Sequence, residues 1–244
     1  MWCVPPRRQH QLLDEPLLVG TLSVKSVNSV RDLGVYLDTD MSMGTHISKL
    51  VSSCFGILRQ IRCIRRSLTR SSLSTVITAF ILSKVDYCNV ALSGLPKCDL
   101  DRLQSVINAA ARLTSDSCRY DHVTPLLNDL HWLRVPERIT YKLCVLVFNC
   151  LHGTAPRYLQ DVIQPVAEVT SRRRLQRSAS SSALAVPATR RSSLGDRAFA
   201  VAGPHAWNSE FTSVHHRLLV TSHLQEISQY LFIQLFFLDH EPDY

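Results

Sequence analysis

The stretch THISKLVSSCFGILRQIRCIRRSLTR (Thr45–Arg70) decides the fold, because its apolar residues return every three or four positions. These apolar positions are Ile47, Leu50, Val51, Cys54, Ile57, Leu58, Ile61 and Ile64. The period is that of one face of an α-helix. It predicts a long helix that begins near Thr45 and buries this face, Ile57 and Ile61 included.

The same stretch carries arginines that also lie three or four residues apart. They are Arg59, Arg62, Arg66 and Arg70. A helical wheel places them away from the apolar face, so we expect Arg59 and Arg66 to be exposed. No acidic residue lies between Lys49 and Asp86 to balance them. A solvated helix face is one interpretation; we favour contact with nucleic-acid phosphates, which guanidinium groups bind through paired hydrogen bonds.

The segment VRDLGVYLDTDMSM (Val30–Met43) precedes this helix and carries the pair Asp38 and Asp40. Short apolar runs within residues 20–43, among them TLSVKSV and DLGVYL, predict the strands of a β-hairpin. Carboxylates two apart could share one face of a strand and hold a metal ion for phosphoryl chemistry. Aspartates also favour turns, because their side chains bond to nearby backbone N–H groups. We favour a turn at residues 38–40.

Further helices follow the cationic one. We expect one to start near Thr69 or Ser71, one near Asp99, and one at Thr124 with Pro125 as its first helical residue. A further helix should start at Pro136 and end just before Gly153, and a short one should form in APRYLQDVI. The predicted apolar positions are Leu73, Val76, Ile77, Phe80 and Ile81, then Leu103, Val106, Ile107, Ala110 and Leu113, and finally Ile139, Leu143, Val147 and Leu151. This succession predicts a helical domain over residues 45–165.

Beyond residue 165 the composition changes. The segment Ser171–Phe199 is rich in arginine and serine and has little periodicity, which predicts a basic irregular segment over 166–198. Its first arginines are a second candidate nucleic-acid site, with a disordered tail as the alternative. They are Arg172, Arg173, Arg174 and Arg177. A C-terminal helical tail over 199–244 follows, with Trp207 as an anchor and an amphipathic helix near His223–Phe232.

Composition sets the class of partner. Of the 244 residues, 45% are hydrophobic, enough for a core, and the formal net charge of +7 favours an anionic partner. The N-terminal residues 1–19 contain no secretory signal, and no apolar run is long enough to span a bilayer. We therefore expect a soluble intracellular protein, in the nucleus or cytoplasm, that does not bind membranes.

The residues that usually carry chemistry give little support for an enzyme. The sequence has no nucleophile elbow, P-loop, dinucleotide-binding glycine pattern or H-E-x-x-H motif, so we expect no cofactor and no small-molecule substrate. Its eight cysteines form no C-x-x-C pair and are interpreted as free core thiols of a reducing compartment. Cys118, His122 and His131 lack a fourth ligand for zinc. His131 and Trp132 could stack on bases, but LHWL in a helical region is more often core.

Several segments, in order, resemble the C-terminal region of reverse transcriptases of non-LTR (LINE-type, jockey-like) retrotransposons. They are VRDLGVYLDTDMSMGTHI, KVDYCNVALSGLP, LQSVINAAARLT, HVTPLLNDLHWLRVPERITYKLCVLVFNCLHGTAPRYL and GDRAFAVAGPHAWN. The resemblance spans about residues 22–208 and rests on the order and spacing of these segments. The chain departs from that pattern at residues 1–19 and after residue 208.

The resemblance implies the end of a polymerase palm, a helical thumb and the region that follows. In that family the metal-binding aspartates, in a Tyr/Phe-Ala-Asp-Asp motif, lie upstream of the LGV stretch, and nothing in residues 1–29 matches them. It therefore implies a non-catalytic fragment of an RNA-directed DNA polymerase. Weak, sequence-independent binding of RNA/DNA duplex or element RNA is the expected activity. A helical protein-interaction module, or a decayed relic without selected function, is the alternative.

Overall fold

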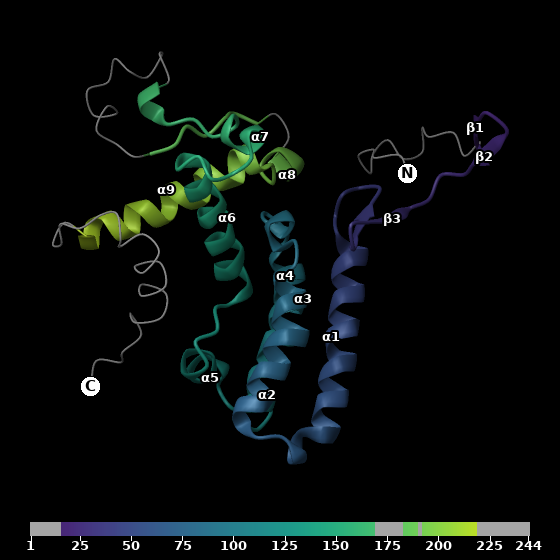
Figure 1. Ribbon diagram of the computed structural model, residues 1–244, viewed down its shortest axis with the longest axis vertical. Coiled ribbons are helices and arrows are strands. Elements are labelled where there is room, and N and C mark those ends of the chain that lie inside the picture. Colours follow the sequence, from purple (N-terminus) through teal and green to yellow (C-terminus); the bar gives the residue numbers. More distant parts are fainter. Residues whose placement is uncertain (1–15, 169–182, 190–191, 219–244) are drawn as a thin grey trace. The chain divides into compact units, whose positions relative to one another are not determined.

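The computed structural model describes residues 16–168, 183–189 and 192–218 and is mainly helical, with β-hairpins ahead of the helices, as predicted (Figure 1). The chain forms two compact units. The described part of the first comprises residues 16–88 and 95–116; the second comprises 89–94 and the described residues from 117 onward. The predicted helical region 45–165 is thus shared between the units.

The N-terminal β-structure consists of two antiparallel hairpins where the sequence predicted one. Strands β1 (Leu17–Val19) and β2 (Leu22–Val24) form the first, and β3 (Ser29–Asp32) and β4 (Val35–Asp38) the second. DLGVYL is not one strand, because Leu33 and Gly34 make a tight turn within it. Their φ angles are 45° and 87°, and two consecutive positive values match the twist of a two-residue hairpin.

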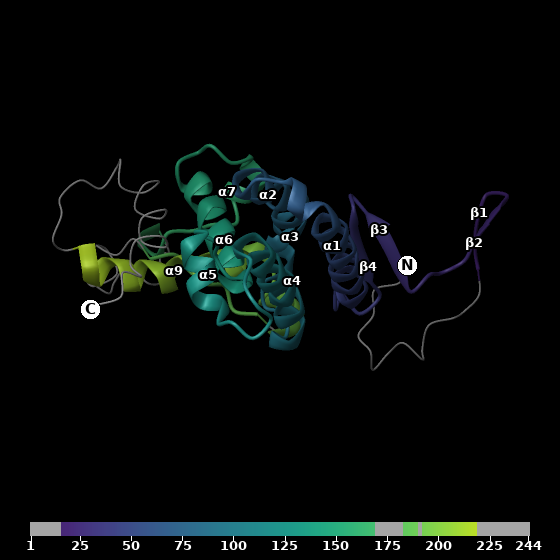
Figure 2. The ribbon, with the colours of Figure 1, turned by 90° about the horizontal axis from the view of Figure 1, so that it is seen from below.

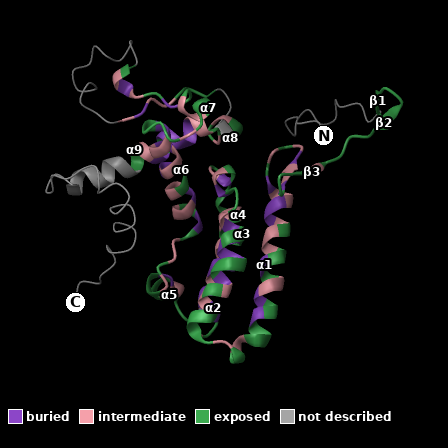
Figure 3. Ribbon diagram, in the orientation of Figure 1, coloured by how far each residue is buried: buried purple, intermediate pink, exposed green. Residues whose placement is uncertain are grey.

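The first unit is built around α1 (Gly44–Ile64), which packs against α4 (Lys97–Ser115) and against a broken helix (Figures 1 and 2). This second helix comprises α2 (Arg70–Ile77), the π-helical turn η3 (Thr78–Leu82) and α3 (Ser83–Asp86). Buried residues lie on one side of α1 (Figure 3). Ile61 is buried as predicted, but Ile57 is only half-buried and Ile64 is exposed because the helix ends there.

The π-helical turn changes which side chains enter the core. Leu73, Ile77 and Ile81 are buried as predicted, whereas Phe80 is exposed. A π turn adds one residue to the helical repeat, so the residues after it rotate relative to an uninterrupted α-helix. Val85 is consequently buried at the end of the helix. In contrast, α4 is regular, and all five of its predicted core positions are buried.

The second unit is centred on α6 (Val135–Leu151), which packs against α9 (Phe199–Leu218). Ile139, Leu143 and Val147 are buried as predicted, but Leu151 is exposed and Cys150 takes its place in the core. Gly153 follows the C-cap with a φ of 71°, the left-handed conformation that glycine adopts most readily. The other helices in the described part of this unit are η4 (Asn89–Leu92), α5 (Val123–Asp129), α7 (Arg157–Gln160), η5 (Val166–Glu168) and α8 (Ser192–Gly195).

The predicted start of helix α5 is wrong for both Thr124 and Pro125. Helix α5 has His122 at its N-cap, so Thr124 and Pro125 lie inside its first turn. The Thr124 hydroxyl accepts a hydrogen bond from the Arg134 guanidinium at 3.0 Å instead of capping the helix.

Trp207 is an anchor, as expected: it packs on a cluster formed by Val147, Cys150, Ile163 and Leu184. The predicted helix at His223–Phe232 lies outside the described residues.

Candidate nucleic-acid interface

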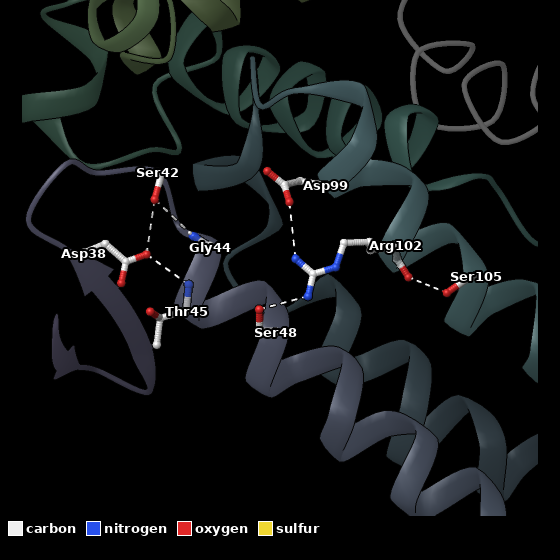
Figure 4. A network of polar contacts seen from close by, with 8 residues as sticks. All are labelled: Asp38, Ser42, Gly44, Thr45, Ser48, Asp99, Arg102 and Ser105. Carbon is white, nitrogen blue, oxygen red and sulfur yellow. Dashed lines mark hydrogen bonds and ion pairs between the residues drawn. The ribbon is translucent and has the colours of Figure 1, made fainter. Parts of the chain in front are cut away.

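Asp38, at the end of β4, has a buried carboxylate that serves the first turn of α1. Its Oδ2 accepts hydrogen bonds from the backbone N–H of Thr45 at 3.0 Å and from the Ser42 hydroxyl at 3.4 Å (Figure 4). Met43, at the N-cap position, gives no side-chain hydrogen bond. A carboxylate here satisfies a backbone donor and interacts favourably with the helix dipole. Asp38 is therefore the cap of α1, supplied from the hairpin.

Asp40 is also a turn residue. Its Oδ1 accepts a hydrogen bond from the backbone N–H of Ser42 at 2.9 Å, and this bond lowers the pKa of the Asp40 carboxyl. Both acids thus bond to nearby backbone N–H groups, which confirms the turn interpretation. In the described part of the chain, no group of three or more His, Cys, Asp or Glu side chains could hold a metal ion.

The predicted arginine stripe does not lie on a single helix. Arg59 and Arg62 belong to α1, Arg66 lies in the 3₁₀ turn η2 (Arg65–Ser67), and Arg70 is the first residue of α2. The reason is Thr69, whose hydroxyl accepts a hydrogen bond from the backbone N–H of Ser72 at 3.1 Å and so caps a new helix. The four arginines instead occupy three successive elements at the joint between α1 and α2.

The charges at this joint are largely uncompensated. All four predicted arginines are exposed. Among the described residues, none of the four takes part in an ion pair. Arg62 lies in the last turn of α1, where a cation also interacts favourably with the helix dipole. Helix α1 thus gives Arg62 a favourable local interaction, but none of the four arginines has an acidic partner in the part of the chain that the structure describes.

A hollow of about 570 Å³ opens at the same joint, and the end of α4 forms its other wall. Its lining comprises Arg65, Arg66, Leu68, Arg70, Leu73, Thr114, Ser115 and Asp116. Arg65 forms an ion pair with Asp116, and the hydrogen bond between them lowers the pKa of the Asp116 carboxyl. Three guanidinium groups share the hollow with one carboxylate, so it carries excess positive charge and suits an oxyanion such as phosphate.

Sequence reasoning missed Arg65 and Asp116. Arg65 directly precedes the predicted Arg66, but the helical spacing excluded it because the helix was expected to continue. Its partner is 51 residues away, and no local pattern indicates that pairing. The dipeptide Arg65-Arg66 was the signal available in the sequence. Adjacent residues of a helix point in different directions, so two neighbouring arginines cannot both belong to one helical stripe.

The remaining predicted binding residues lie elsewhere in the sequence. Arg172, Arg173, Arg174 and Arg177 lie outside the described residues. His131 and Trp132 follow the end of α5 and are not inside a helix: His131 is exposed with a φ of 54°, and Trp132 is half-buried. Both predictions for LHWL, helix and core, are wrong for His131.

The cysteines divide between core and surface. Cys54, Cys144 and Cys150 are buried, and burial raises the pKa of the Cys54 and Cys150 thiols. The remaining described cysteines are exposed: Cys63, Cys88, Cys98 and Cys118. The interpretation as core thiols therefore holds for three of them.

Compared with known proteins, the chain matches no family model, no curated protein and no solved structure. Within the ranges that the structure describes, every helix is too short or too polar to cross a membrane.

Proposed function

We propose that the chain binds the phosphate backbone of duplex nucleic acid, without reading its sequence, through the arginines at the α1–α2 joint. The observation that carries the proposal is the excess of cations there: Arg59, Arg62, Arg66 and Arg70 are exposed and have no acidic partner among the described residues. Exposed guanidinium groups of this kind beside a hollow are suited to phosphate contacts, which position a duplex but carry no sequence information.

The resemblance described above suggests the origin of this surface. We propose that the chain derives from the end of the palm and the thumb of a non-LTR retrotransposon reverse transcriptase, and that it acts in the nucleus or cytoplasm. An RNA–DNA hybrid or the element's own RNA is then the natural ligand. A thumb grips a duplex through its backbone, which fits a cationic joint at the C-terminal end of the helix that follows the hairpin.

We further propose that the chain does not extend primers. Metal-ion catalysis of phosphoryl transfer requires carboxylates that are free to hold the ions. Asp38 and Asp40, the acids of the D-x-D pair, already bond to backbone N–H groups of the loop before α1 and of its first turn. Template-dependent extension that is lost in Asp38→Ala would contradict this.

A protein-interaction module is the second candidate, and the first hairpin favours it. Strands β1 and β2 expose apolar side chains along both strands. They are Leu17, Leu18, Val19, Leu22 and Val24. Exposed apolar clusters often mark contact surfaces. Salt separates this candidate from the first, because apolar contacts do not weaken as salt rises whereas phosphate contacts do.

The test is a salt titration of a fluorescent RNA–DNA hybrid with the full chain and with the variant Arg59→Gln/Arg62→Gln/Arg66→Gln. Affinity should lie roughly between 10⁻⁴ and 10⁻⁶ M at physiological salt, and the slope of log K against log salt should fall by roughly one for each phosphate that the variant no longer binds. The weakening should be equal for unrelated sequences, since no base edge is read.

The matched control is Arg119→Gln/Lys142→Gln/Arg157→Gln, which removes three exposed cations from the second unit and so has the same net charge. It should retain most of the parent's salt slope. Equal affinity and slope in both variants would refute the joint as the binding surface and leave the interaction module or the relic.

A further inference from the structure

A second hollow lies toward the other end of α1, between the β3–β4 hairpin, α1 and α3. Its volume is about 430 Å³, within the range of roughly 300–1,000 Å³ that small-molecule sites occupy. Its charged and aromatic lining comprises Arg31, Tyr36, Lys49, Lys84 and Tyr87, with His46 beside them. None of the described residues that line it is acidic.

The cations of this hollow are held in place by neutral groups. The Lys49 ammonium lies 3.9 Å from the centroid of the Tyr36 ring, and the Arg31 guanidinium lies 5.7 Å from the same centroid. The Lys84 ammonium donates a hydrogen bond to the Ser53 hydroxyl at 3.0 Å. Among the described residues none of these three cations forms an ion pair. Their mutual repulsion falls when an anion enters.

Tyr87 adds an anchored aromatic ring. Its hydroxyl donates a hydrogen bond to the backbone carbonyl of Leu33 at 2.5 Å. Its ring lies over Gly34, with the nearest ring atom 3.5 Å from where a Cβ of that residue would be. Yet 51% of Tyr87 remains exposed. A ring that is fixed at its hydroxyl and open to solvent loses little conformational freedom when it stacks on a ligand.

The π-helical turn η3 is what brings Lys84 to this site. Residue 84 lies seven positions after the buried Ile77, about two turns of an α-helix, and would share its face if the helix were uninterrupted. The extra residue of the π turn rotates the chain so that Val85 is buried and Lys84 is exposed. Such turns are frequent at functional sites.

We propose that this hollow binds a nucleotide, whose base stacks on Tyr87 and whose phosphate lies among Arg31, Lys49 and Lys84. Cations alone would suit any anion; the anchored ring is what specifies a base. Aromatic platforms beside positive charge bind successive nucleotides of single strands with little sequence preference. The nucleotide can be free or one unit of an unpaired strand.

This site is separate from the arginine joint, and its proposal does not rest on duplex binding there. Ser53, in this hollow, and Arg62, at the joint, are nine residues apart on α1. That separation is about 2.5 turns and about 14 Å along the axis, so the two side chains lie on opposite sides of the helix.

The first test follows backbone amide NMR signals of the full chain during titration with AMP, ribose 5-phosphate, adenosine and a single-stranded dA hexamer. AMP should shift the amides of Gly34, Lys84 and Tyr87, and it should bind more tightly than ribose 5-phosphate or adenosine. Tighter binding of the hexamer than of AMP identifies an unpaired strand as the ligand, and equal affinities identify the free nucleotide. Ribose 5-phosphate binding as tightly as AMP, or no shifts with either AMP or the hexamer, overturns the proposal.

The second test uses variants in the same titration. Tyr87→Leu should weaken AMP binding by roughly 5- to 150-fold, the usual cost of losing one stacked ring, whereas Tyr87→Phe keeps the ring and should bind within a few-fold of the parent. Lys84→Gln, at an exposed position, should also weaken AMP, and Tyr120→Leu, which removes a tyrosine that is 88% exposed in the second unit, should not.

The arginine-joint triple variant separates the two proposals. It should bind AMP like the parent, because the joint lies at the other end of α1. Parent-like AMP affinity in both Tyr87→Leu and Lys84→Gln would overturn the nucleotide site while leaving the duplex salt slope intact.

Discussion

Replacing Asp38 by alanine should destabilise the first turn of α1 more than it destabilises any other helix. The change removes the oxygen that accepts hydrogen bonds from Thr45 and Ser42. Loss of a capping side chain costs about 0.5–2 kcal/mol. The Thr45 N–H is only part-buried, so leaving it unsatisfied adds less than the cost of about 1–3 kcal/mol for a fully buried donor. Asp38 is only 9% exposed, so water replaces the carboxylate poorly. We expect opening of the first turn to become easier by about 2 kcal/mol.

Hydrogen exchange measured by mass spectrometry reads this change locally. An opening free energy lower by about 2 kcal/mol makes amides that exchange through this opening do so roughly 30-fold faster. Peptides that cover residues 44–64 report on α1, and peptides that cover residues 135–151, in α6, serve as an internal reference. Asp38→Asn retains an acceptor oxygen and should lose less protection than Asp38→Ala.

Asp40→Ala is the matched control, because it removes a carboxylate only two residues away. Asp40 is exposed and bonds to Ser42 within the turn, so its loss should stay within about 0.5 kcal/mol, or about twofold in exchange. Equal acceleration of α1 in both variants would refute the capping role of Asp38. So would a loss of protection in α6 as large as that in α1.

Two further changes test the hairpin and the joint. Leu33 is 83% exposed at a φ of 45°, a conformation that costs most L-residues roughly 1–2 kcal/mol and asparagine less. Leu33→Asn should therefore raise the opening free energy of residues 29–38 by about 1 kcal/mol and slow their amide exchange. Unchanged exchange would contradict this. The hydrogen bond from Arg65 lowers the pKa of Asp116, so its contribution to stability is complete above the ordinary carboxyl value of roughly 4 and disappears as pH falls through the lower folded value. Helical circular dichroism of the parent should therefore fall more steeply below about pH 4 than that of Asp116→Asn, and less so at high salt, whereas parallel curves would contradict the ion pair.

Regular helices were predictable from the sequence because their burial follows a single period. In α4 the pattern Leu103, Val106, Ile107 runs without interruption, and the structure buries every predicted position. The buried positions of helix α6 were equally predictable up to its last turn, where Cys150 is buried in place of Leu151. Gly153 gave its end, because few other residues adopt a positive φ without strain.

The rest of the fold could not be predicted, because it depends on local interruptions that the spacing of apolar residues does not reveal. A π turn in η3 displaces Phe80 from the core, and a threonine cap at residue 69 starts a new helix inside what reads as one continuous stripe. Both are decided by backbone hydrogen bonds that compete locally with the α-helical ladder. The pairing of Arg65 with Asp116, and of Tyr87 with the Leu33 carbonyl 54 residues away, requires the tertiary fold itself.

Arg70 occupies a position at which the helix dipole disfavours a cation. Cations are favourable at helix C-termini and unfavourable at N-termini, by about 0.3–1 kcal/mol at exposed sites. Arg62 lies in the last turn of α1 and follows that rule, as Asp38 does at the opposite end of the same helix. Arg70 opens α2, at the positive end of its dipole, and lines the hollow with Arg66. A cation there is a local cost to folding that a bound phosphate would offset, because the guanidinium and the helix N-terminus both attract an anion.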